Sequence, residues 1–198
     1  MKNRFILLLP ILIPVLLIAA CNNNEEAPEE NYIDLFFNNL AEHCGNAYEG
    51  RLVVDRPGDD MLEGDELLIA HFRECSDDEI RIPFHIETAE GEWDRSRTWI
   101  ITHHTDSLEI RHDHRYEDGT EEENTMYGGF THIAPDGNRH EFLYPPRTEE
   151  VGVPMGWRLE IEPGQRYTYG TMRDSEFTWR VDFDLSETTE APPAPWGF

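Results

Sequence analysis

Three histidines lie close together in the middle of the chain and could hold a metal ion. His103, His112 and His114 fall on two consecutive segments that alternate apolar and polar residues. If these segments form a hairpin that turns at residues 106–107, the three imidazoles share its apolar face, with Trp99 opposite His114. Neutral imidazole is a ligand of Zn²⁺ and of haem iron. One interpretation is therefore a zinc site with an open water position, or a haem held by one of these histidines.

The competing interpretation is that the same three histidines only complete the core. They would then hydrogen-bond to buried carboxylates and to the main chain. The sequence contains no HExxH-type signature and no acidic residue placed as a fourth ligand. The structural interpretation is therefore favoured, and the sequence leans against an enzyme without excluding one.

A second cluster of charged residues flanks the same two segments. It consists of Asp94, Arg95, Arg97, Asp113 and Arg115. Arginine beside carboxylate on neighbouring strands is typical of bidentate ion pairs, which indicates a structural role. The functional alternative is a grip for an anion or a carbohydrate at the mouth of a barrel.

The segments that carry these residues are predicted to be strands of an all-β domain. A first segment has apolar residues at helical spacing from Ile33 to Cys44, followed by Gly45 as a helix cap. Everything after it alternates with period two and is interrupted by turn residues. The ten expected strands are 51–54, 66–73, 80–86, 98–103, 108–114, 126–133, 140–144, 157–161, 166–172 and 177–185.

Ten short strands joined by tight turns predict an antiparallel meander. We expect it to close into a lipocalin-like barrel, with the short N-terminal helix covering one mouth; the alternative is a β-sandwich. In the last strand, Phe177, Trp179, Val181, Phe183 and Leu185 are expected to share the dry face. The paired glycines 128 and 129 indicate a bulge or the close approach of another backbone.

The cysteines predict both a disulfide and a lipid anchor. Lys2 and Arg4 precede an apolar run of 16 residues that ends in Ala19-Ala20-Cys21. This is typical of a targeting segment, because it is too short to span a bilayer. If Cys21 is modified, Cys44 and Cys75 remain as a pair, and a disulfide between them is expected in an oxidising compartment.

The end of the apolar run resembles the lipobox of bacterial lipoprotein precursors. The resemblance implies cleavage before Cys21 and acylation of its thiol, with palmitate among the chains, so that the protein is anchored to a lipid bilayer in the cell envelope. In Gram-negative lipoproteins an Asn at position 22 favours the outer membrane, facing the periplasm or the exterior. The alternative is an ordinary secretory signal cleaved after Ala20. The expected organisation is a signal peptide (1–20), a lipidated tether (21–31), a single barrel domain (32–185) and a Pro-rich tail (186–198), in which Trp196 docks on the surface.

The charge balance excludes a nucleic-acid partner. The chain has 41 acidic residues against 16 Lys+Arg, a formal net charge of −25. Removal of residues 1–20 would leave 14 Arg, no Lys and 41 acids, a formal charge of −27. Such a surface repels phosphate backbones.

Several local motifs together resemble a group of uncharacterised bacterial secreted proteins. They are Cys44-Gly45, Asp94–Trp99, His112–Arg115 with Asp118-Gly119, Tyr127–Gly129 and Pro192–Gly197. The resemblance spans most of the mature chain and implies no activity, ligand or catalytic residue.

Three functions remain open from the sequence. The first is a small-ligand-binding or envelope-interaction module, whose interior of Trp, Phe, Tyr and His accepts an amphipathic molecule. The second is a metal-dependent enzyme that uses His103, His112 and His114. The third is a purely structural envelope protein. A cavity of about 300 Å³ or more at the histidines would favour binding or catalysis, and a filled interior would favour the structural role.

Overall fold

The computed structural model describes residues 31–56, 62 and 64–198. The expected signal peptide, Cys21 and the tether up to residue 30 lie outside these residues. The described chain contains helices α1 (Tyr32–Ala41) and α2 (Pro145–Val151). Its strands are β1 (Ala47–Val54), β2 (Leu68–His71), β3 (Glu74–Cys75), β4 (Glu79–Glu87), β5 (Trp93–His104), β6 (Ser107–His114), β7 (Tyr127–Asp136), β8 (Arg139–Leu143), β9 (Met155–Glu162), β10 (Arg166–Arg173) and β11 (Glu176–Asp184).

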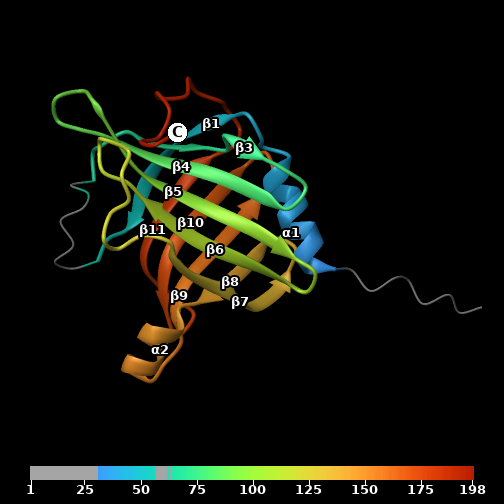
Figure 1. The fold of residues 1–198 in the computed structure, drawn as a ribbon. Coiled ribbons are helices and arrows are strands. Elements are labelled where there is room, and N and C mark those ends of the chain that lie inside the picture. Colours follow the sequence, from blue (N-terminus) through green and yellow to red (C-terminus); the bar gives the residue numbers. More distant parts are fainter. Residues whose placement is uncertain (1–30, 57–61, 63) are drawn as a thin grey trace, which may run out of the picture.

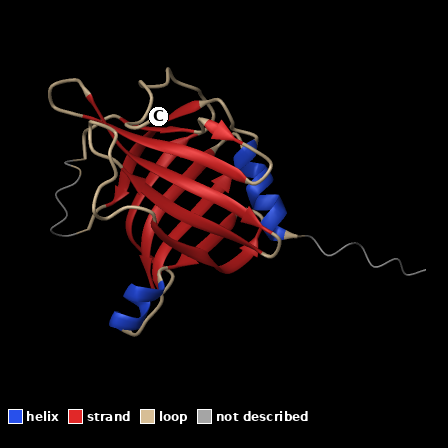
Figure 2. Ribbon diagram, in the orientation of Figure 1, coloured by secondary structure: helices blue, strands red, loops and turns tan. Residues whose placement is uncertain are grey.

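The strands form a closed antiparallel barrel, which confirms the predicted fold (Figures 1 and 2). Consecutive strands from β4 to β11 pair with one another, β11 pairs with β1, and β1 pairs with β2. Pairing of β2 with β4 then closes the ring of ten strands, while β3 is an extra strand on β4. Closure removes the free edges that a sandwich of two sheets would keep, so the sandwich alternative is wrong. The architecture fits an all-β lipocalin-like barrel.

Helix α1 covers one end of the barrel, as predicted (Figure 2). The side chain of Asn31 accepts hydrogen bonds from two backbone amides of the first turn and so caps the helix. Phe36, Phe37 and Leu40 are buried in the barrel core. The side chain of Asn39 donates to the carbonyl of Gly137, in the turn between β7 and β8. We call this end, to which the β5–β6 and β7–β8 turns belong, the closed end. Among the described residues, no helix has the length and apolar character needed to cross a bilayer.

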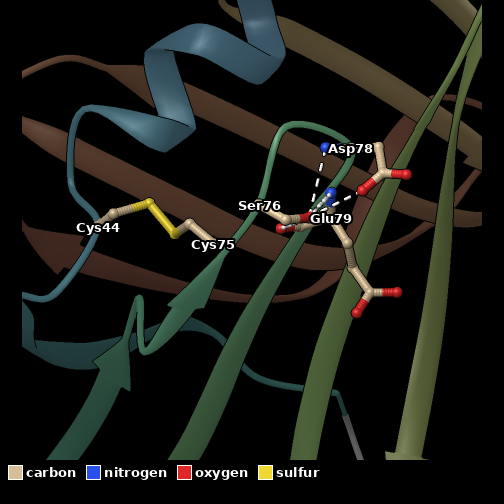
Figure 3. Close-up of a disulfide and its surroundings, with 5 residues drawn as sticks. All are labelled: Cys44, Cys75, Ser76, Asp78 and Glu79. Atoms are coloured by element: carbon tan, nitrogen blue, oxygen red, sulfur yellow. Dashed lines mark hydrogen bonds between the residues drawn. A yellow bond between two sulfur atoms is a disulfide. The ribbon is translucent and has the colours of Figure 1, made fainter.

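The predicted disulfide joins Cys44 to Cys75 (Figure 3). Cys44 follows α1, and Cys75 is the last residue of β3, which pairs with β4 near the closed end. The tight turn after β3 is fixed by Ser76, whose hydroxyl donates to Asp78 and accepts from the amide of Glu79. The crosslink therefore fastens the segment behind α1 to the wall of the barrel.

The β5–β6 hairpin has the predicted faces but a different register. Its turn lies at residues 105–106 instead of 106–107, so Trp99 pairs with His112 and not with His114. Because this shift moves the pairing by two residues, each side chain keeps its side of the sheet. The apolar face of the hairpin points into the barrel, where it contributes Trp99, Ile101, Leu108 and Ile110 to the core.

The last strand departs from the predicted alternation at one residue. Trp179, Val181, Phe183 and Leu185 are buried in the core, as expected. A bulge at Thr178 shifts the pairing: Thr171 of β10 pairs with Trp179, but the next residue, Met172, pairs with Phe177. Phe177 consequently lies on the outer face, where the guanidinium groups of Arg158 and Arg180 stack over its ring at 4.7 and 5.2 Å.

The two glycines of β7 allow the close approach of neighbouring backbones, as predicted. A Cβ atom on Gly128 would lie 1.8 Å from the carbonyl oxygen of Ile110 in β6. A Cβ atom on Gly129 would lie 1.6 Å from the carbonyl oxygen of Leu143, the last residue of β8. The glycines thus admit the flanking strands on both sides of β7.

Two elements were not predicted from the sequence, β3 and α2. Helix α2 begins with two prolines and ends at Gly152, which has a left-handed conformation (φ 78°). It connects β8 to β9 and projects from the end of the barrel opposite to α1 (Figure 1). None of its residues is buried, so the helix has no apolar stripe that periodicity could have revealed.

Candidate functional site

A cavity of about 300 Å³ lies in the barrel at the end opposite to α1, which we call the open end. The interior near the closed end is filled by α1 and by the buried side chains of the surrounding strands. The open-end cavity is lined by aromatic rings, two histidines, two arginines and one threonine: Arg56, Phe84, Arg97, Trp99, His112, His114, Tyr127, Trp157, Tyr169, Thr171 and Trp179. A volume of this size is at the lower limit for pockets that hold small organic ligands.

The walls of the cavity are built from stacked rings. Trp99 stacks on Phe84 at one side and on Tyr169 at the other, with ring centroids 4.9 and 4.0 Å apart. His112 stacks on Tyr127 in the same way, with centroids 4.9 Å apart and nearly parallel planes, and packs against Trp157 at 4.5 Å. These rings come from six different strands, which barrel closure brings together. They present flat, apolar surfaces to any molecule inside.

His112 is held neutral in a defined orientation. Its Nδ1 donates to the carbonyl oxygen of Tyr127 at 3.2 Å, so Nε2 accepts from the hydroxyl of Tyr169 at 2.6 Å. Burial lowers the pKa of His112 to about 3. Burial raises the pKa of the Tyr169 hydroxyl well above its usual value. Both groups are therefore uncharged hydrogen-bonding partners at neutral pH.

His114 lies nearer the rim of the cavity. Its Nε2 shares a hydrogen bond of 3.2 Å with the hydroxyl of Tyr127, and its Nδ1 is 3.9 Å from the carboxylate of Glu122. Burial and the positive charge of Arg97 lower its pKa. The cavity thus contains two neutral imidazoles and no imidazolium at pH 7.

The third histidine of the predicted metal site lies elsewhere. The Nε2 atom of His103 is hydrogen-bonded to Oδ1 of Asp34 in α1 at 2.7 Å, and the imidazole ring packs against Phe37 at the closed end. His103 is four residues along β5 from Trp99, the partner of His112, which corresponds to about 13 Å. In the described part of the chain, no three His, Cys, Asp or Glu side chains form a group that could hold a metal ion. The structure brings His112 and His114 together and separates His103 from them.

The predicted charged cluster divides into two parts, and one of them faces the cavity. Arg97 uses its Nη1 to contact the carboxylate of Asp94 at 2.6 Å and the hydroxyl of Ser96 at 2.8 Å. Burial raises the pKa of Asp94, but hydrogen bonds from Ser96 and the charge of Arg97 outweigh it, so the pKa is lowered. The ionised carboxylate fixes the guanidinium of Arg97 at the wall of the cavity.

The other part of the cluster holds the C-terminal tail on the outside of the barrel. Arg95 donates to the carbonyl oxygen of Ala194 at 2.7 Å, and the amide of Trp196 donates back to the carbonyl of Arg95. Arg115 pairs with the buried Asp113 at 2.9 Å and lies over the ring of Phe198. Trp196 docks as predicted. Arg95 and Arg115 contact the protein's own tail, and Asp113 pairs with Arg115, which supports the structural interpretation for this half of the cluster.

An open groove of about 700 Å³ adjoins the cavity at its mouth. Arg56, Trp157 and Thr171 line both hollows. Arg56 donates to the hydroxyl of Thr171 at 3.0 Å. The groove widens the entrance between the ends of β1, β9, β10 and β11 and the base of α2, and its lining includes two further arginines, Arg147 and Arg173.

Most of the cavity was not predicted from the sequence. One hairpin carries His112, His114, Arg97 and Trp99, so the pairing of two neighbouring segments was enough to predict that these four residues lie close together. The rings of Tyr127, Trp157 and Tyr169 belong to strands far away in the chain. Period-two alternation does predict that these rings face inward, as it does for Trp157, Leu159 and Ile161 of β9. It does not distinguish inward residues that line a cavity from those that fill the core.

The chain was also compared with known proteins. No protein-family model, curated protein or solved structure matches it. The function must therefore be inferred from the geometry of the cavity itself.

Proposed function

We propose that this protein is a lipid-anchored, extracytoplasmic binding protein that holds a small amphipathic molecule in the open end of its barrel. The observation that carries the proposal is the cavity of about 300 Å³ among stacked rings, with His112, His114 and Arg97 as polar contacts. A few polar groups in a mainly apolar pocket are the usual composition of a small-molecule site. A barrel with a purely structural role would be filled at both ends.

The point at which the proposed tether joins the described chain is compatible with this function. Asn31 caps α1 at the closed end, and the proposed lipid anchor at Cys21 precedes it by ten residues. The anchor therefore joins the barrel at the end opposite to the cavity. An anchored molecule would keep its open end accessible to solutes.

Binding can be tested with N-phenyl-1-naphthylamine, an uncharged aromatic probe whose fluorescence rises in apolar surroundings. We expect saturable binding and a rise in the melting temperature with probe concentration, because a ligand that binds only the folded state stabilises it. Replacement of Thr171 by Trp adds a bulky ring to the lining of the cavity and should weaken binding at least about tenfold.

The matched control is Thr102→Trp. Thr102 is also a strand threonine that is partly exposed, but it faces outward on β5, opposite Glu109. This variant should bind the probe like the wild type. The cavity is refuted as the site if the wild type does not bind, or if both Trp variants retain wild-type affinity while circular dichroism shows them to be folded.

The lipid anchor requires a separate test in a bacterial host. Cells fed with labelled palmitate should incorporate the label into the full chain and not into a Cys21→Ser variant. Two or more acyl chains give stable membrane attachment, so the wild type should sediment with membranes and the variant should not. Unlabelled wild-type protein with a mature N-terminus other than Cys21 would contradict lipidation.

A further inference from the structure

We propose that the ligand of the open-end cavity is a small organic anion, with an apolar, planar body between the stacked rings and a carboxylate or similar acidic group on Arg97 and Arg56. This inference rests on the proposed binding function and specifies its ligand class. It follows from the charges around the cavity, the free donors of its arginines and the neutrality of its histidines.

The charge at the open end is opposite to that of the rest of the protein. Among the residues that the structure describes, the lining of the cavity contains two arginines and no carboxylate. The described lining of the adjoining groove has three arginines, of which Arg56 is shared and Arg147 pairs with Glu150, and one acidic residue, Asp55. The whole chain has 41 acids against 16 Lys+Arg. The mouth of the cavity is therefore the place where an anion is attracted to this otherwise acidic molecule.

Two of these arginines also lack the ion pairs that most others make. Within the described ranges, ten arginines have a carboxylate within 4.0 Å. Arg56 and Arg173, which line the groove, have none among the residues that the structure describes. Among the described residues, the one side-chain hydrogen bond of Arg56 is to the hydroxyl of Thr171. Surface arginines in such an acidic protein are usually neutralised, so an unpaired guanidinium at a cavity mouth is available for an anionic ligand.

Arg97 is already paired but keeps a free edge. Both of its contacts use Nη1, and neither Nε nor Nη2 has a hydrogen-bond partner in the described part of the chain. Its guanidinium is anchored by Asp94 and Ser96 and lines the cavity. A pre-positioned guanidinium can bind a carboxylate with little loss of side-chain entropy.

The remaining polar groups do not favour a cation. His112 and His114 are neutral, and none of the described residues that line the cavity is a carboxylate that could pair with an ammonium group. The aromatic rings alone could attract a cation, but the guanidinium of Arg97 beside them would repel it. The distant acids of the surface matter less, because charges beyond the Debye length of about 8 Å at physiological ionic strength are largely screened.

Three naphthalene compounds of the same shape test the inference: 2-naphthoate, 2-naphthamide and 2-naphthylmethylammonium. In calorimetry with the full mature chain we expect 2-naphthoate to bind at least about tenfold more tightly than the amide, because it adds charge-assisted hydrogen bonds to arginine. The ammonium compound should bind more weakly than the amide. Equal affinity for the three compounds, or preference for the ammonium, overturns the anion proposal and leaves the binding function intact. Failure of all three to bind, together with failure of N-phenyl-1-naphthylamine, would reject the binding function itself.

Arginine variants locate the charge contact. Arg56→Gln leaves every ion pair of the described residues in place and should lower the naphthoate-to-naphthamide preference several-fold. Arg97→Gln should lower it further, and Arg97→Lys, which keeps the charge but not the planar edge, should restore it in part. The matched control is Arg51→Gln, since Arg51 is an exposed arginine of β1 outside both hollows and has no carboxylate within 4.0 Å among the described residues. If Arg51→Gln reduces the preference as much as Arg56→Gln, the effect is one of net charge and the proposed contact is wrong.

Discussion

Mild acid should destabilise this protein steeply between about pH 6.5 and 5. Three histidines are almost completely inaccessible to solvent: His85 and His140 are 0% exposed, and His112 is 2% exposed. Burial lowers the pKa of His85 and of His140 to about 4 and that of His112 to about 3. At pH values between 5 and 6.5 the three histidines are therefore neutral in the folded protein, whereas they bind protons in the unfolded chain.

The sign of the effect follows from proton linkage. In the unfolded chain these histidines titrate near pH 6.5. Between that pH and their folded pKa values, the unfolded state binds more protons, so the free energy of unfolding falls as the pH falls. Each histidine contributes up to about 1.4 kcal/mol per pH unit, and the three together approach about 4 kcal/mol per pH unit. This is large against the 5–15 kcal/mol that typically stabilises a domain of this kind.

The measurement is denaturant unfolding at a series of pH values. The window from pH 6.5 to 5 lies above the ordinary pKa values of Asp and Glu, which are about 4 in unfolded chains. Their protonation relieves like-charge repulsion and acts in the opposite direction. A free energy of unfolding that is flat across this window would show that the buried histidines are not neutral in the fold.

His85→Leu provides the sharpest variant for this test. Neither ring nitrogen of His85 has a hydrogen-bond partner among the described residues, so a leucine of similar size should be tolerated or stabilising at pH 7. It should reduce the slope by about 1.4 kcal/mol per pH unit. The control is His132→Leu, at an exposed position on β7. If the slope of His85→Leu equals that of the wild type, the assignment to His85 is incorrect.

Removal of the disulfide should be the second large effect. The bond between Cys44 and Cys75 closes a loop with a sequence separation of 31. A crosslink of this span lowers the entropy of the unfolded chain and corresponds to about 3–4 kcal/mol. The double variant Cys44→Ser/Cys75→Ser should lose that amount in denaturant unfolding. Binding of N-phenyl-1-naphthylamine to the variant that remains folded should be retained, because the crosslink lies at the closed end and the cavity at the open end.

Reduction provides the control. Dithiothreitol should lower the stability of the wild type to the level of the double variant and should not change the double variant. Helix α1 retains its own contacts in both cases, since Phe36, Phe37 and Leu40 stay in the core. A loss of stability below about 1 kcal/mol, or an effect of dithiothreitol on the double variant, would show that the crosslink does not stabilise the fold as expected.

The spacing of apolar residues along the sequence was sufficient to predict most of the helices and strands. All ten strands that period-two alternation predicts are present, and the helix around Phe36 covers one end of the barrel. These predictions succeed because alternation and helical spacing are properties of neighbouring residues. The exceptions have local causes too. The bulge at Thr178 moves Phe177 to the outside, and α2 buries no residue that would give it an apolar stripe.

In the candidate site, alternation predicts which face of the sheet a side chain lies on but not which side chains lie close together. The even register shift of the β5–β6 hairpin kept His103, His112 and His114 on one face, as predicted. One face of a hairpin is nevertheless long enough to reach from one end of the barrel to the other. His103 therefore meets α1, and His112 meets Tyr169. The three histidines therefore lie on the same face of the sheet but do not form one site.

The sequence by itself determined ten of the strands, the N-terminal helix, the disulfide and the inward or outward direction of most side chains, because each depends on residue type and near spacing. Only the tertiary structure decided which inward side chains meet around a cavity. Closure of the barrel through β2 and β4 brings rings from β4, β5, β6, β7, β9, β10 and β11 to one end, with Arg56 and Arg97 beside them. Contacts between strands so distant in the chain depend on strand order, tilt and the volume of the filled half, and alternation within a strand carries no information about them.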